Sequence, residues 1–204
     1  MKKSAMNVPN MLSMLRVLLV PAFVAAMIFM RDIPIWGQII PALIYALTAL
    51  TDMLDGKIAR KYNLVTDFGK FIDPLADKFM VIGSQVAILT TMLLVADSTA
   101  DVAWCIIFTF LVLIILLREL GVTSLRLVVA GKSGIVVAAS MLGKIKTVSQ
   151  MVGTLVIILE PLIFPFSAQS HIIAYALMAL MAFTTLFSGI DYLKAYLPHI
   201  DTNS

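Results

Sequence analysis

The chain has 204 residues, of which 61% are apolar and only 13% are charged, and its formal net charge is +3. Soluble domains contain about 45–50% apolar and about 25% charged residues, so this composition excludes a disordered chain and argues against a soluble globular domain. The basic residues form no stripe interleaved with aromatic residues, so nucleic-acid binding is not expected. Because a spanning helix needs about 20 apolar residues, the length allows six or seven membrane spans.

Six apolar windows predict six transmembrane helices, so the expected fold is an all-α integral membrane protein. The windows cover residues 11–30, 35–51, 79–96, 102–120, 145–163 and 172–190. Turn-forming segments at 30–34, 97–101 and 161–170 separate three pairs of windows. No flexible linker or internal repeat is visible in the sequence, which predicts a single domain over residues 1–204.

Alternation of six spans places both chain ends, residues 57–78 and residues 118–146 on one side of the membrane. Fourteen of the 15 lysine and arginine residues then lie on that side, and only Arg31 lies opposite. Cytoplasmic loops of membrane proteins carry an excess of lysine and arginine. The pattern therefore predicts that both termini are cytoplasmic.

Four aspartates stand in the passage that joins the second window to the third. On a helix, Asp52 and Asp55 share one face with Gly56 beside them, and Asp73 and Asp77 share another face four residues apart. If the two helices are antiparallel neighbours, both pairs of carboxylates reach the same depth near the cytoplasmic surface. An active site is therefore expected at the cytoplasmic ends of helices 2 and 3.

Four carboxylates at one depth repel one another, since each close pair costs roughly 4 kcal/mol at an effective dielectric of 20 and a separation of 4 Å. No protein cation is expected to be central enough to neutralise them, so a metal ion is predicted. Oxygen ligands with no histidine or cysteine nearby favour Mg²⁺ or Mn²⁺, as one ion or two, or Ca²⁺. His171 and His199 lie on other segments and are not expected to be ligands.

A simpler interpretation makes the aspartates helix caps and partners of nearby cations. Asp73 precedes Pro74, as an N-cap precedes a proline at the first helical position. Caps could account for two of the aspartates. They do not account for four on matching faces, with the small residues Gly56, Ala59 and Gly69 between them.

The spacing of these residues is similar to the signature of the CDP-alcohol phosphotransferases, Asp-x2-Asp-Gly-x2-Ala-Arg-x8-Gly-x3-Asp-x3-Asp. All eight fixed positions are matched, by Asp52, Asp55, Gly56, Ala59, Arg60, Gly69, Asp73 and Asp77. The resemblance extends to the six-span architecture. It implies an enzyme that transfers a phosphatidyl or similar group from a CDP-linked donor to an alcohol and releases CMP.

The same resemblance implies a role for each matching residue. Asp52, Asp55 and Asp73 would hold two Mg²⁺ or Mn²⁺ ions, and Asp77 would share a metal and act as the general base on the incoming hydroxyl. Such ions neutralise charge on the transferred group and the leaving CMP, and a positioned carboxylate can take the proton of the alcohol. The predicted donor-binding residues are Gly56, Ala59, Arg60, Thr66 and Gly69. A homodimer in the inner membrane of a bacterium is also implied.

A second group of cations lies at the predicted cytoplasmic ends of the fourth and fifth windows. Such charges can be ordinary positive-inside residues that attract anionic membrane lipid, and this interpretation suits Lys132. Arg118, however, directly follows a 16-residue uncharged run. Charges so close to the apolar zone usually face the interior of the bundle.

An acceptor that carries its own phosphate would need a cationic pocket, because arginine binds phosphate oxygens in bidentate fashion. The predicted acceptor-phosphate ligands are Arg118, Arg126, Lys144 and Lys146. Their segments resemble those of family members that join CDP-diacylglycerol to sn-glycerol 3-phosphate, giving phosphatidylglycerophosphate and CMP. Two alternatives stay open: a family member with serine, inositol phosphate or a phospholipid as acceptor, and a cation-coupled transporter, because ionisable residues in spans often mark ion pathways.

Overall fold

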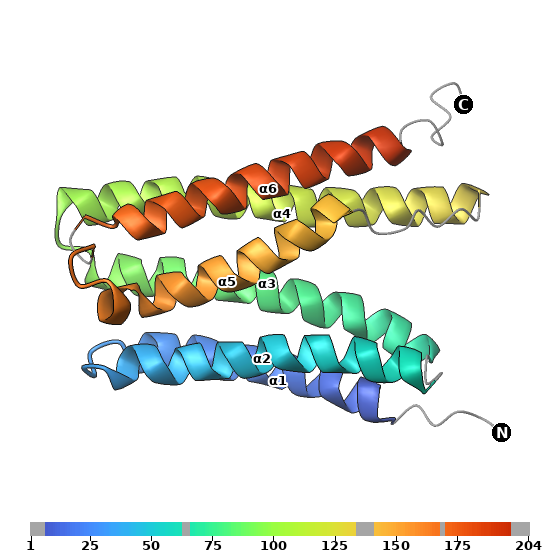
Figure 1. The fold of residues 1–204 in the computed structure, drawn as a ribbon, viewed down its shortest axis with the longest axis horizontal. Coiled ribbons are helices and arrows are strands. Elements are labelled where there is room, and N and C mark those ends of the chain that lie inside the picture. Colours follow the sequence, from blue (N-terminus) through green and yellow to red (C-terminus); the bar gives the residue numbers. More distant parts are fainter. Residues whose placement is uncertain (1–6, 63–65, 134–140, 168–169, 197–204) are drawn as a thin grey trace.

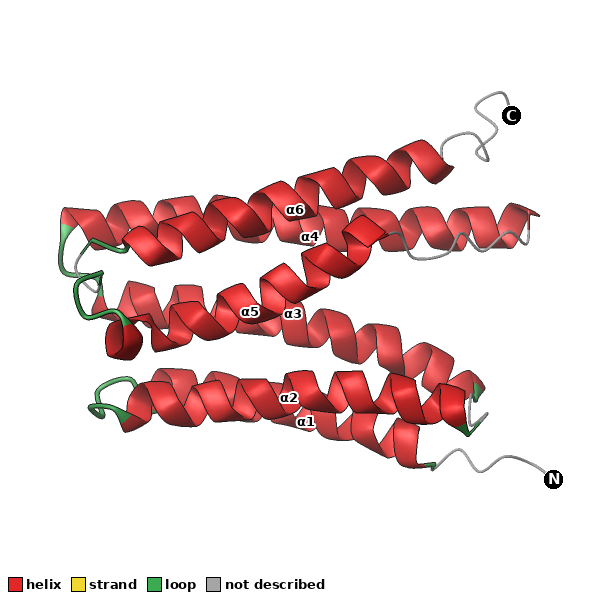
Figure 2. Ribbon diagram, viewed as in Figure 1, coloured by secondary structure: helices red, strands yellow, loops and turns green. Residues whose placement is uncertain are grey.

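The computed structural model describes residues 7–62, 66–133, 141–167 and 170–196. These residues form long helices (Figures 1 and 2), with the bounds α1 (Val8–Phe29), α2 (Trp36–Lys61), α3 (Asp67–Val95), α4 (Thr99–Ser133), α5 (Met141–Ile163) and α6 (Ile172–Tyr196). Each of the six is long and apolar enough to cross a membrane. The prediction of six spanning helices, separated by turns after the first, third and fifth, is therefore confirmed.

Successive helices run in opposite directions, so the helix termini gather at two opposite ends of the bundle (Figure 1). One end, on the right in Figure 1, collects the start of α1, the end of α2, the start of α3, the end of α4 and the end of α6. It also holds all four aspartates of the signature and is called the aspartate end below. The turns after α1, α3 and α5 lie at the opposite end.

The helices form a ring in the order α1, α2, α5, α6, α4, α3, because each packs against the next in this order and α3 closes the ring on α1. α3 also touches α5 across the ring. Large apolar side chains from several helices fill the interior. They include Phe23, Met80, Ile88, Phe108, Ile115 and Met181.

α2 and α3 are antiparallel, as expected, but they are not close neighbours. Within the described residues α1 packs extensively against both of them, and α2 and α3 make few direct contacts with each other. The expectation that α2 and α3 lie side by side is therefore wrong. The consequence is that α1 brings its own side chains between the two pairs of aspartates.

The start of α3 is set by a cap upstream of the aspartates. Thr66 is the N-cap, and its hydroxyl accepts a hydrogen bond from the backbone N–H of Gly69 at 3.0 Å. The helix begins at Asp67, so Asp73 lies inside it and Pro74 does not mark its first turn. The interpretation of Asp73 as an N-cap is wrong, and its carboxylate is not needed to start the helix.

Three helices continue well beyond their predicted apolar windows at the aspartate end. α2 extends to Lys61, α3 begins at Asp67 and α4 extends to Ser133. A helix needs apolar residues all round only where lipid surrounds it, and outside that zone one apolar face is enough. The predicted windows therefore mark the apolar parts of longer helices, and the four aspartates lie on the polar extensions of α2 and α3.

Candidate active site

The four aspartates predicted as metal ligands come together at the aspartate end, two from α2 and two from α3. Three of them contact one side chain of α1, that of Arg16. The guanidinium of Arg16 contacts Asp52 at 2.8 Å and Asp77 through Nη1, and Asp55 through Nη2. The Arg16 side chain is 0% exposed, so this ion-pair network is buried at its centre.

The expectation that no protein cation lies among the aspartates is therefore wrong. Arg16 was missed because it is far from the signature in sequence, and only the packing of α1 between α2 and α3 brings it there. A signal was present nonetheless. Arg16 is the only charged residue of the window 11–30, and a charge within a span usually faces a polar interior.

Ser13 stands one turn before Arg16 and is also fully buried. Its hydroxyl lies at hydrogen-bond distance from the carboxylate of Asp73 and 3.3 Å from that of Asp55. Arg16 and Ser13 together therefore give each of the four aspartates a polar partner on α1. Because they are three residues apart, both project from the same face of this helix.

Asn10 continues this polar face toward the start of α3. Its side-chain amide donates a hydrogen bond to the hydroxyl of Thr66 at 2.8 Å. A Cβ atom on Gly69 would lie 2.7 Å from Asn10 Oδ1, so a larger residue here would have to displace the buried Asn10 side chain. Thr66 and Gly69, predicted to bind the CDP donor, thus have a structural role in seating α3 on α1.

A cavity of about 850 Å³ opens beside the aspartates and is lined from α2, α3, α4, α5 and α6. Asp52 and Asp77 line one part of it. The four predicted acceptor-phosphate ligands line another, namely Arg118, Arg126, Lys144 and Lys146. The structure therefore brings residues of the two predicted clusters, from four different helices, to one cavity.

The cavity is charged at the aspartate end and apolar deeper in the bundle. Its apolar wall comes mostly from α2 and α5 and includes Tyr45, Ala46, Ala49, Met151, Val152 and Leu155. At a rise of about 1.5 Å per residue, Lys144 and Leu155 on α5 are roughly 16 Å apart along the helix. The cavity can thus take a molecule with a polar head and an apolar tail.

The predicted donor-binding residues do not line this cavity, as far as their side chains are described. Gly56 and Ala59 are half-buried on α2, and Thr66 and Gly69 face α1. The side chain of Arg60 lies outside the described residues.

The four predicted phosphate ligands differ in their surroundings. Lys146 is buried and forms an ion pair with Glu119. Arg118 lies 3.2 Å from the same carboxylate, whereas Arg126 and Lys144 are exposed. Glu119 was not predicted as a site residue, although it adjoins Arg118 in the sequence. It offsets part of the positive charge and ties α4 to α5.

α6 supplies two further side chains that sequence reasoning missed. Arg118 donates a hydrogen bond to the hydroxyl of Ser188 at 2.6 Å and lies 5.2 Å from the ring centroid of Tyr192. Arg126 lies 6.0 Å from the same ring. Ser188 and Tyr192 are four residues apart and so share one helix face, but nothing in their own segment marks them as partners of α4.

Comparison with known proteins identifies the group to which this architecture belongs. The model of the CDP-alcohol phosphatidyltransferase family matches residues 6–187. The chain belongs to this family. The resemblance inferred from the eight-residue signature is confirmed, and with it the expectation of an enzyme of this type.

Curated relatives in the family extend over nearly the whole chain. The CDP-diacylglycerol–glycerol-3-phosphate 3-phosphatidyltransferase of Bacillus subtilis is 39% identical over 198 residues, which cover 91% of this chain and 93% of the relative. A probable phosphatidylglycerophosphate synthase of Mycobacterium tuberculosis is 34% identical and covers 95% and 83%. The CDP-diacylglycerol–glycerol-3-phosphate 3-phosphatidyltransferase of Pseudomonas fluorescens is 30% identical, and the match covers 97% of this chain and 94% of the relative.

Members of the CDP-alcohol phosphatidyltransferase family generally depend on divalent metal ions. Four carboxylates with no histidine or cysteine among them offer only oxygen atoms, which Mg²⁺ and Mn²⁺ prefer. In the described part of the chain, however, no three acidic, histidine or cysteine side chains surround a common point as ligands would. The types of side chain fit a metal ion, but three of the four carboxylates point their oxygen atoms at Arg16.

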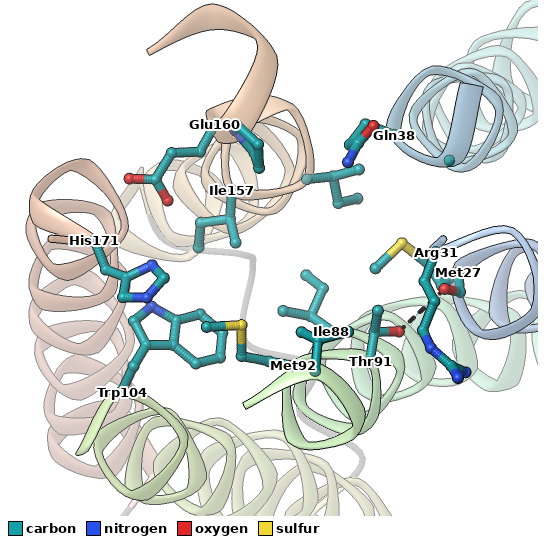
Figure 3. Close-up of a pocket in the computed structure, with 14 residues that line it drawn as sticks. Met27, Arg31, Gln38, Ile88, Thr91, Met92, Trp104, Ile157, Glu160 and His171 are labelled. Carbon is teal, nitrogen blue, oxygen red and sulfur yellow. Dashed lines mark hydrogen bonds between the residues drawn. The ribbon is translucent and has the colours of Figure 1, made fainter. Parts of the chain in front are cut away.

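The opposite end of the bundle holds a smaller cavity of about 190 Å³ (Figure 3). His171 lies there, and its imidazole is 2.8 Å from the carboxylate of Asp101. Glu160, also at this cavity, accepts a hydrogen bond from Ser167 at 2.6 Å. These polar groups are satisfied within the opposite end and take no part in the aspartate cluster. His199 lies outside the described residues.

Proposed function

We propose that this chain transfers the phosphatidyl group of CDP-diacylglycerol to sn-glycerol 3-phosphate, giving phosphatidylglycerophosphate and CMP. The observation that carries the proposal is the cavity, which combines two aspartates, four cations and an apolar wall. These features match a lipid donor with a charged head and a small acceptor with a phosphate of its own. Relatives named for this reaction, which cover more than nine tenths of the chain, support the same substrates.

The donor would enter with its acyl chains along the apolar wall of α2 and α5. Its diphosphate then reaches the place where that wall meets Asp52 and Asp77. Asp52, Asp55, Asp73 and Asp77 would hold one or two Mg²⁺ or Mn²⁺ ions, which when bound neutralise charge on the transferred phosphoryl group and on CMP. The small residues Gly56 and Ala59, with Arg60, would accommodate the nucleotide.

The acceptor would bind across the cavity from the aspartates. Arg118 and Lys146 hold its phosphate, and Glu119 together with α6 keeps both cations in position. The free hydroxyl then faces Asp77, which takes its proton. A bond forms between the hydroxyl oxygen and the phosphatidyl phosphorus, and the bond from that phosphorus to the oxygen of CMP breaks.

We further propose that the aspartate end faces the cytoplasm of a bacterium and that both termini lie there, in the inner membrane. The excess of lysine and arginine on that side supports this orientation. A single domain over residues 1–204 and assembly into a homodimer remain predictions.

Two alternatives are less well supported. Serine carries no phosphate and would not need the four cations that line the cavity. A cation-coupled transporter typically places its carboxylates near the bilayer midplane on broken helices. Asp52 and Asp77 instead lie just outside the apolar windows 35–51 and 79–96, and α2 and α3 are continuous.

The test is to supply purified protein with labelled CDP-diacylglycerol and one acceptor at a time. We expect labelled phosphatidylglycerophosphate from glycerol 3-phosphate, with stoichiometric CMP, and little product from serine, inositol phosphate, glycerol or a phospholipid. Chelation with EDTA should abolish turnover, and Mg²⁺ or Mn²⁺ should restore it. Preferential use of another acceptor would refute the substrate assignment, and full turnover after exhaustive chelation would refute the metal assignment.

A further inference from the structure

Arg16 is a buried cation that serves several acids at once. Its guanidinium contacts the carboxylates of Asp52, Asp55 and Asp77, and its side chain is fully buried. A guanidinium is always charged and presents its N–H groups in a rigid planar fork, which suits a position between carboxylates from two helices. One guanidinium cannot neutralise four carboxylates, so the cluster keeps a net negative charge that favours the binding of a further cation.

The position of Arg16 matters because it uses the oxygen atoms that a metal would need. Carboxylates that bind a divalent ion must turn oxygen atoms toward the ion. Here three of the four carboxylates direct oxygens to Nη1 and Nη2 of Arg16, and no three acidic side chains in the described residues surround another common point.

We propose that Arg16 is an internal counter-cation of the metal site, which holds the carboxylates together before metal arrives and competes with metal for their oxygen atoms. This inference rests on the metal role given to the aspartates under the proposed function and adds a residue of α1 to that site. Two properties follow from it. The metal-free protein depends on Arg16 for stability, and its metal affinity is lower than the carboxylates alone would give.

The test compares wild type with Arg16→Gln and Arg16→Lys, using Mn²⁺ as the probe. Mn²⁺ binding is measured by electron paramagnetic resonance on purified protein in detergent, and thermal unfolding is followed with and without Mn²⁺. Arg16→Gln should bind Mn²⁺ at least about 10-fold more tightly, the factor that one lost charge-assisted hydrogen bond is worth. It should also unfold at a lower temperature than wild type without metal, and Mn²⁺ should remove most of that deficit.

Arg16→Lys keeps the charge but loses the planar fork, so its Mn²⁺ affinity should lie between those of wild type and Arg16→Gln. Arg31→Gln is the matched control, because Arg31 follows α1 at the opposite end and pairs with Asp32. It should leave Mn²⁺ affinity unchanged. Arg16→Gln is purified in Mn²⁺ if it proves unstable without metal. The proposal is then supported if chelation unfolds Arg16→Gln but leaves wild type folded. An Mn²⁺ affinity of Arg16→Lys between those of the other two proteins supports it as well.

Unchanged or weaker Mn²⁺ binding by both Arg16 variants would overturn the proposal. If the Arg16 guanidinium competes with Mn²⁺ for the carboxylates, its removal must strengthen Mn²⁺ binding. Absence of Mn²⁺ binding from wild type and variants alike would overturn it too. Failure of the proposed reaction is distinguishable. Protein that binds Mn²⁺ as expected but makes no phosphatidylglycerophosphate would refute the substrate assignment and leave the role of Arg16 intact.

Discussion

The aspartates that meet Arg16 differ most in their exposure. The side chain of Asp55 is 8% exposed, that of Asp52 29% and that of Asp77 54%. A carboxylate that takes a proton from an incoming alcohol must be reachable from the cavity, whereas a buried one is better suited to hold an ion in place. The gradient of exposure therefore favours Asp77 as the base and Asp55 as a ligand only.

Replacing Asp77 by asparagine should separate binding from proton transfer. Asparagine keeps the size and one oxygen of aspartate but cannot accept the proton of the hydroxyl. With donor, acceptor and metal saturating, kcat should fall by roughly 10²-fold or more, the usual scale for a lost general base. The measurement is steady-state turnover together with donor binding, which should persist. Wild-type kcat in Asp77→Asn would rule out the role as base.

Replacing Asp55 by alanine should remove a ligand from the buried side of the cluster. Because Arg16 still pairs with Asp52 and Asp77, we expect the helices to stay together and the protein to elute normally on size exclusion. Activity should fall by orders of magnitude, and Asp52→Ala and Asp73→Ala should behave alike. An Asp55→Ala variant with normal turnover would contradict the predicted metal site.

At the scale of helices, α4 and α5 present to the cavity the cations that we propose to bind the acceptor. Arg118→Ala and Lys146→Ala should each raise the KM for glycerol 3-phosphate by about 10- to 150-fold, since a charge-assisted contact is worth roughly 1.5–3 kcal/mol. The KM for CDP-diacylglycerol should change little. Lys144→Ala should have a smaller effect, because Lys144 is exposed. Equal shifts in both KM values would show that the cations do not select the acceptor.

α6 contacts the proposed acceptor-binding arginines of α4 through Tyr192, so this residue should act by positioning them. Tyr192→Leu removes the ring beside Arg118 and Arg126, and a cation–π contact of about 0.5–2 kcal/mol predicts a rise in acceptor KM of roughly 2- to 30-fold. Tyr192→Phe keeps a ring and should restore the KM. Phe183→Leu, an exposed position on the same helix, is the control. A variant Tyr192→Phe as impaired as Tyr192→Leu would refute the interpretation.

The elements differ in how far the sequence predicts them. Hydropathy predicts the apolar part of each helix, because lipid requires apolar side chains there. The four aspartates from Asp52 to Asp77 are also predicted, because their spacing repeats on helix faces. The ends of α2 and α4 cannot be predicted in this way, because polar helical turns resemble loops in composition. Arg16, Ser188 and Tyr192 reach the site through packing of α1 and α6, and such long-range neighbours leave no trace in local spacing.

At the scale of the whole molecule, the ring of helices joins two parts of the site. α1, α2 and α3 assemble the aspartates around Arg16, while α4, α5 and α6 assemble the cations around Glu119 and Tyr192. The two halves meet where α5 packs on α2 and α4 packs on α3. The cavity is lined from both halves, so the residues proposed to bind the donor and the acceptor face a common space.

The orientation of the ring in the membrane can be tested with single cysteines. Cys105 is buried, and Cys105→Ala provides a background in which Asp97→Cys and Tyr62→Cys mark opposite ends of the bundle at exposed positions. A membrane-impermeant thiol reagent applied to intact spheroplasts should label the cysteine at position 97 and spare that at position 62. Lysis should then make both reactive, because the aspartate end is predicted to be cytoplasmic from its lysine and arginine excess. Labelling of position 62 alone in intact spheroplasts would reverse the topology, and the site would then face away from substrates in the cytoplasm.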